Sequence, residues 1–91
     1  MRALKIRTRQ GMVALTGEEA GELRDRLAQV GPARAAGGTL VVSANASTSI
    51  TFTDVEKAAV LEVLIGWLEQ ASAGAGLVAL RNALANDLGR A

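Results

Sequence analysis

The chain has 91 residues, of which 49% are hydrophobic and 21% charged, and its formal net charge is +1. This composition lies outside the disordered range and predicts one small folded domain over residues 1–91. A net charge this small provides no global field that would recruit nucleic acid or anionic lipid. Because cysteine and histidine are both absent, disulfides, thiol chemistry and the usual zinc ligands are excluded, and we expect neither metal nor cofactor.

The first third of the chain, residues 3–30, has the pattern of a hairpin followed by a helix. Apolar residues alternate with polar ones on both sides of a turn near Gly11, which predicts two short strands with one apolar face. Thr16 and Glu19 have the spacing of a capping box and mark the start of the helix. The side chains expected to be buried by this helix are Ala20, Leu23, Leu27 and Val30.

A second unit over residues 40–70 repeats this order. Strands are predicted over 40–44 and 49–52, and Thr53 with Glu56 forms a second capping box. Two such ββα units predict an α+β fold, in which a four-stranded antiparallel sheet carries both helices on one face. The alternative is a chance match, because a strand, a threonine cap and an amphipathic helix are common in unrelated proteins.

The second predicted helix is more apolar than one sheet can cover. Its apolar side chains fill roughly 200° of the circumference, whereas a surface helix needs about 100°. Trp67 lies on this apolar arc and is expected to be largely buried. After the glycine-containing connector 71–76, a further helix is predicted over 77–88 with a stripe of leucines. That helix either packs back within the chain or reaches across a dimer. We expect a homodimer around the second helix, with an interface that includes Leu61, Ile65, Leu80 and Leu84.

No group of residues resembles a catalytic constellation, so we expect no enzyme. Most carboxylates stand at predicted helix starts, where capping explains them. The hydroxyl-rich segment 43–49 has the composition of a polar hairpin turn. Gly37 and Gly38 precede a predicted strand, whereas a phosphate-binding loop would join a strand to a helix.

Basic residues cluster at the start of the chain. The first ten residues contain four of them, Arg2, Lys5, Arg7 and Arg9, and no acid, and the last three share one face of a strand. Residues 35–53 carry no charge at all. Since exposed edge strands are usually protected by charges, the second hairpin should be covered. The basic residues either bind an anionic ligand or only keep an exposed sheet face soluble.

The stretch "VALTGEEAGELRDRLAQV", with the strand before it, resembles the ββα dimerisation module of small actinobacterial nucleoid-bridging proteins. The resemblance covers roughly residues 3–30 and rests on two strands, a threonine cap, an acidic first turn and a helix rich in leucine and arginine. It implies self-association. That family binds DNA through a separate basic domain, and we expect no such domain within residues 1–91, so no DNA-contacting residue is implied.

The sequence therefore predicts a small non-enzymatic protein-interaction or oligomerisation module, such as an adaptor in a bacterial complex. Its expected partners are a second copy of itself and an unidentified protein. The alternative is nucleic-acid or anionic-ligand binding through the basic N-terminal hairpin. The N-terminus has no apolar signal-peptide core, and the apolar stretch 58–68 is far shorter than the roughly 20 residues of a membrane span. We accordingly expect a cytoplasmic protein without membrane contact.

Overall fold

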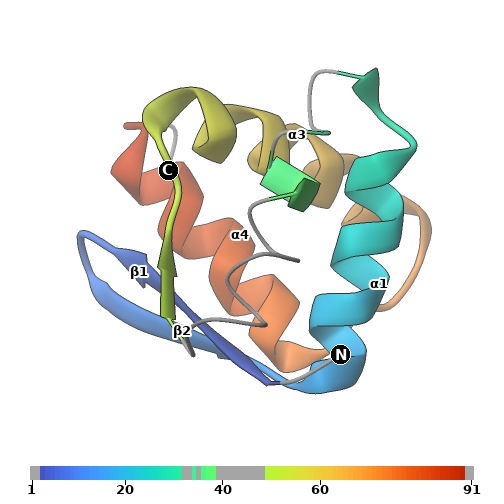
Figure 1. The fold of residues 1–91 in the computed structure, drawn as a ribbon, viewed down its shortest axis with the longest axis horizontal. Coiled ribbons are helices and arrows are strands. Elements are labelled where there is room, and N and C mark those ends of the chain that lie inside the picture. The colour runs from blue at the N-terminus through green and yellow to red at the C-terminus, as the bar shows by residue number, and fades with distance from the viewer. Residues whose placement is uncertain (1–2, 32–33, 35, 39–48, 90–91) are drawn as a thin grey trace.

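A computed structural model of the chain describes residues 3–31, 34, 36–38 and 49–89. These residues form a small sheet packed against helices (Figure 1). In chain order, the elements are β1 (Leu4–Thr8), β2 (Gly11–Leu15), α1 (Gly17–Ala28), β3 (Ser49–Thr51), α3 (Asp54–Gln70) and α4 (Ala75–Asp87).

The sheet has three strands in the order β2-β1-β3, with β1 in the centre. β1 and β2 are antiparallel, with Leu4 opposite Leu15, whereas β1 and β3 are parallel, with Ile6 opposite Ile50. The four-stranded antiparallel sheet expected from the sequence is therefore wrong, because the described residues form a three-stranded mixed sheet. The strand predicted over 40–44 lies outside the described residues.

The parallel pair follows from what lies between the strands. A tight turn joins antiparallel neighbours, but parallel neighbours need a longer crossover connection. α1 lies in the connection between β2 and β3, and β3 pairs with β1 on the side away from β2. The strand pattern at 49–52 was correctly located, but alternation alone carries no information on which strand lies beside it or in which direction it runs.

The turn between β1 and β2 depends on the Thr8 side chain and on the backbone conformation of Gly11. The hydroxyl of Thr8 donates a hydrogen bond to the Gly11 carbonyl at 2.8 Å and accepts one from the Gln10 N–H at 3.2 Å. Gly11 has φ +119°, a conformation that L side chains rarely adopt. The sequence prediction of a turn near this glycine is confirmed.

Both predicted capping boxes are present. The Thr16 hydroxyl accepts the Glu19 N–H at 3.1 Å while the Glu19 carboxylate accepts the Thr16 N–H at 3.0 Å, and Thr53 and Glu56 make the same pair of bonds at 3.2 and 2.9 Å. The first helix ends at Ala28, so Val30 lies beyond it and is exposed, contrary to expectation. No helix in the described part of the chain is long and apolar enough to cross a membrane.

α4 occupies the centre of the fold. It contacts β1, β2 and α3, while α1 contacts β2 and α3 (Figure 1). Leu77, Leu80 and Leu84 of α4 are all buried. Much of the wide apolar arc of α3 is therefore covered by the last helix of the same chain. Trp67 of α3 is buried as expected, and the Arg26 guanidinium of α1 lies 4.2 Å from the centre of its ring, a cation–π contact that joins the two helices.

Candidate functional site

One face of the sheet is packed and the other is open. Along β1, Leu4, Ile6 and Thr8 are buried while Lys5 and Arg7 are exposed. Residues that pair across neighbouring strands share a face of the sheet. The register therefore gives two rows on the open side, Ser49–Lys5–Ala14 and Thr51–Arg7–Met12. We call these six residues the outer sheet face.

The outer sheet face is basic at its centre. Lys5 and Arg7 lie two positions apart on the central strand, about 7 Å along it, and none of the six residues is acidic. Met12, 47% exposed, adds an apolar side chain beside Arg7. Two neighbouring cations with no carboxylate among the facing side chains produce a local positive potential.

The structure brings together only part of the predicted anion-binding set. Lys5 and Arg7 lie side by side on the outer sheet face, and Arg9 is exposed in the turn at the end of the same strand. The Arg9 backbone N–H has a structural role, because it donates to both carboxylate oxygens of Asp87 at 3.1 Å. Arg2 lies outside the described residues.

The residues predicted to form a dimer interface mostly complete the core of the chain itself. Leu61, Leu80 and Leu84 are fully buried, and Ile65 is partly buried against the core. Of the two arrangements that the sequence left open for the last helix, the structure has the one within the chain. The largest apolar exposure remaining on α3 is at Val55, which is 78% exposed.

A buried ion pair escaped the sequence analysis. Lys57 Nζ of α3 lies 3.1 Å from Asp87 Oδ2 of α4, and their side chains are only 10% and 1% exposed. Together with the Arg9 N–H, this pair joins α3, α4 and the hairpin turn. The sequence contained one local indication of this pair. Asp87 stands at the carboxyl end of a helix, where the helix dipole disfavours an acid. An acid in that position indicates a positively charged partner from elsewhere in the fold.

Glu19 also has a second contact that its capping role did not predict. Its carboxylate accepts the Gly76 N–H at 3.1 Å, which places a negative charge at the amino end of α4. The approach is close: a Cβ at Gly76 would lie 2.7 Å from the Ala14 carbonyl oxygen, and one at Gly74 would overlap the Glu19 carboxylate. One side chain thus caps two helices, and the two glycines make room for it.

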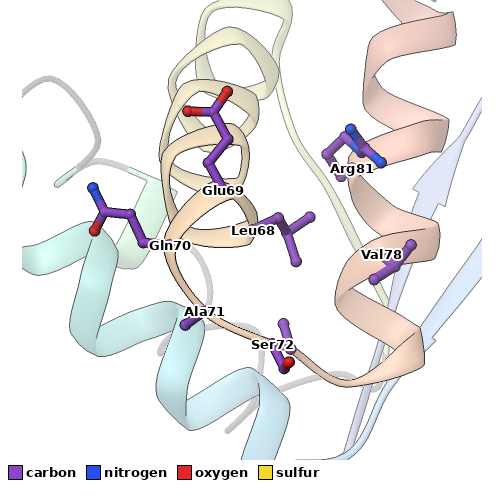
Figure 2. Close-up of a pocket in the computed structure, with 8 residues that line it drawn as sticks. Leu68, Glu69, Gln70, Ala71, Ser72, Val78 and Arg81 are labelled. Carbon is purple, nitrogen blue, oxygen red and sulfur yellow. The ribbon is translucent and has the colours of Figure 1, made fainter.

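A pocket of about 590 Å³ lies where α3 ends and α4 begins (Figure 2). We call it the junction pocket. Arg81 is notable within it because its Nε atom is buried and finds no hydrogen-bond partner among the described residues. An unpaired buried donor on a charged group costs about 1–3 kcal/mol or more. The lining residues are Leu68, Glu69, Gln70, Ala71, Ser72, Ala73, Val78 and Arg81.

Comparison with protein-family models, with curated proteins and with solved structures found no match for the chain. Within the described residues, no group of three or more acidic side chains could hold a metal ion. Two surface features remain as candidates: two cations on an open sheet face, and a pocket with an unpaired guanidinium nitrogen.

Proposed function

We propose that this domain is a non-enzymatic interaction module that binds an acidic protein segment on its outer sheet face. The observation that carries the proposal is the exposure of Lys5 and Arg7, adjacent on the central strand, without a carboxylate among the side chains beside them. Such a face attracts carboxylates and guides them to the middle of the sheet.

The surroundings of the two cations favour a protein partner over nucleic acid. Met12 and Ala14 supply apolar contact on one side, and Thr51 supplies a hydroxyl on the other. The outer sheet face has no aromatic side chain, whereas single-stranded nucleic acid is usually held by bases stacked on aromatic rings. An acidic segment with interspersed apolar residues matches both the charge and the apolar rim.

The test is a titration of an acidic peptide with interspersed leucines, followed by calorimetry at low salt. We expect the double variant Lys5→Gln/Arg7→Gln to lose about tenfold or more in affinity, because each charge-assisted contact is lost. Arg24→Gln is the matched control, since this arginine lies on α1 and pairs with Asp25. Equal affinity in the double variant would contradict the proposal.

Single-stranded oligonucleotides of the same charge form the second arm of this experiment. If an oligonucleotide binds more tightly than the peptide, with an affinity that falls linearly on a log–log plot against salt, the partner class is nucleic acid instead. If neither probe binds at low salt, the basic residues only keep the sheet face soluble, and the proposed function is wrong.

Self-association is a second candidate, favoured by Val55, which is 78% exposed near the start of α3, and by the partly buried Val63 and Ile65 further along the same helix. Exposed apolar groups on a helix are a common basis of symmetric dimers. We expect Ile65→Glu to abolish a dimer seen by sedimentation at micromolar concentration. Leu84→Glu is unsuitable as a test because Leu84 is buried in the chain's own core. A wild-type chain that sediments as a monomer would exclude this candidate.

A further inference from the structure

The junction pocket differs from the outer sheet face in carrying both signs of charge. Glu69 lines it from α3 and Arg81 from α4, and no ion pair joins them in the described structure. Figure 2 shows the two side chains projecting from their helices at the same end of the view, with Ser72 at the other end. An anion alone would be attracted by Arg81 and repelled by Glu69.

Arg81 is the group that most clearly lacks a partner. Its Nε is buried, and the described residues offer that nitrogen no acceptor. Buried polar nitrogens nearly always have a hydrogen-bond partner in folded proteins. A guanidinium presents Nε–H and a terminal N–H in a planar fork that matches the two oxygens of a carboxylate. Arg81 as a whole is partly exposed and lines the pocket, so a carboxylate is the ligand group that the accessible part of its guanidinium would bind there.

The opposite wall favours a cation. α3 ends at Gln70 with no basic residue in its last turn, so its terminal carbonyls meet no cationic side chain from that turn. Helix carboxyl ends attract positive charge, and Glu69 adds a full negative charge at the same place. An ammonium group would be stabilised there by both.

The lining of the pocket also contains apolar side chains, beside the polar Gln70 and Ser72. Leu68 projects from α3 towards α4, where Val78 lies opposite (Figure 2). The volume of about 590 Å³ falls within the usual range of small-molecule sites. A ligand with a short aliphatic side chain would cover these groups.

We propose that the junction pocket binds a small zwitterion, an α-amino acid with a short aliphatic side chain. Its carboxylate pairs with Arg81, its ammonium group pairs with Glu69 and the carboxyl end of α3, and its side chain contacts Leu68 and Val78. The residues of this site do not include Lys5 or Arg7, so the test of the junction pocket is independent of the test of the proposed function.

The experiment is an amide-shift titration of the ¹⁵N-labelled full chain with L-valine. We expect saturable shifts at the lining residues, with dissociation constants in the millimolar range that a small, open pocket allows. Valinamide lacks the carboxylate and N-acetylvaline lacks the ammonium group, so each should bind about tenfold more weakly or worse. Arg81→Gln and Glu69→Gln should weaken valine binding by a similar factor.

Two matched controls separate the pocket from general charge effects. Arg24→Gln and Glu22→Gln remove the same charges from α1 and should leave valine binding unchanged. Glu69 is exposed, so Glu69→Gln should fold and keep the test valid even if Arg81→Gln does not. The proposal is overturned if valine gives no saturable shifts up to about 50 mM, if folded Glu69→Gln binds as tightly as wild type, or if N-acetylvaline binds as well as valine.

Discussion

The buried ion pair between Lys57 and Asp87 should be the charged contact on which stability depends most. Asp87→Asn keeps an oxygen for the Arg9 N–H but leaves the ammonium group of Lys57, whose side chain is only 10% exposed, without a counter-charge. Breaking a buried pair from one side costs about 3–5 kcal/mol. Because the Lys57 side chain retains a little contact with water, we expect about 3 kcal/mol, which lowers Tm by about 12–24 °C in a domain of this size.

Urea unfolding followed by the fluorescence of Trp67, the sole tryptophan, measures this loss. The double variant Lys57→Met/Asp87→Asn should be more stable than Asp87→Asn alone, because no unpaired charge remains buried. Asp25→Asn is the control: it breaks the exposed pair with Arg24, whose side chains are 43% and 65% exposed, and should cost less than about 1 kcal/mol. If Asp87→Asn stays within about 1 kcal/mol of wild type, this account of the pair is wrong.

Further substitutions test the caps and the glycines by the same unfolding assay. Thr16→Ala and Thr53→Ala should each lower the free energy of unfolding by about 1 kcal/mol. Thr51→Ala should lower it clearly less, because Thr51 is exposed and caps no helix. Equal losses at Thr51 and Thr53 would contradict the capping role. Gly76→Ala should destabilise by about 1–3 kcal/mol, because its Cβ would meet a backbone carbonyl at 2.7 Å. Gly66→Ala should instead stabilise the fold by about 0.5–1 kcal/mol, because Gly66 lies in mid-helix and a Cβ added there would have nothing within 4 Å. A change in stability of the same sign at both glycines would refute this reasoning.

Local features were predictable because their causes are local. The capping boxes at Thr16 and Thr53 depend on residues three positions apart, and the alternation around Gly11 depends on immediate neighbours. The burial of Trp67 followed from its place on the apolar arc of a helix. Lys5 and Arg7 were placed on one strand face for the same reason, and they are the part of the predicted site that the structure brings together.

The sequence did not predict features that depend on how distant segments of the chain meet. The parallel pairing of Ile50 with Ile6 depends on the path of the connection through α1. The sequence left open whether the last helix or a second subunit covers the apolar surplus of α3, because it does not show that Leu80 and Leu84 lie at the centre of the chain's own core. Arg81 had no distinguishing pattern at all, since its unpaired nitrogen exists only where α3 and α4 meet.

The contact between the hairpin turn and the end of α4 has a kinetic consequence. The Arg9 N–H and the Asp87 carboxylate are 78 positions apart, so this contact closes one of the longest loops in the chain and should form after the local hairpin and helices. Interactions absent from the folding transition state act on the unfolding rate. Asp87→Ala, which removes the acceptor of the Arg9 N–H, should therefore accelerate unfolding in stopped-flow measurements and leave the refolding rate nearly unchanged. Slower refolding with unchanged unfolding would show that the contact forms early. The contact thus sets the lifetime of the native state, and with it the resistance of the chain to proteases that attack its open form.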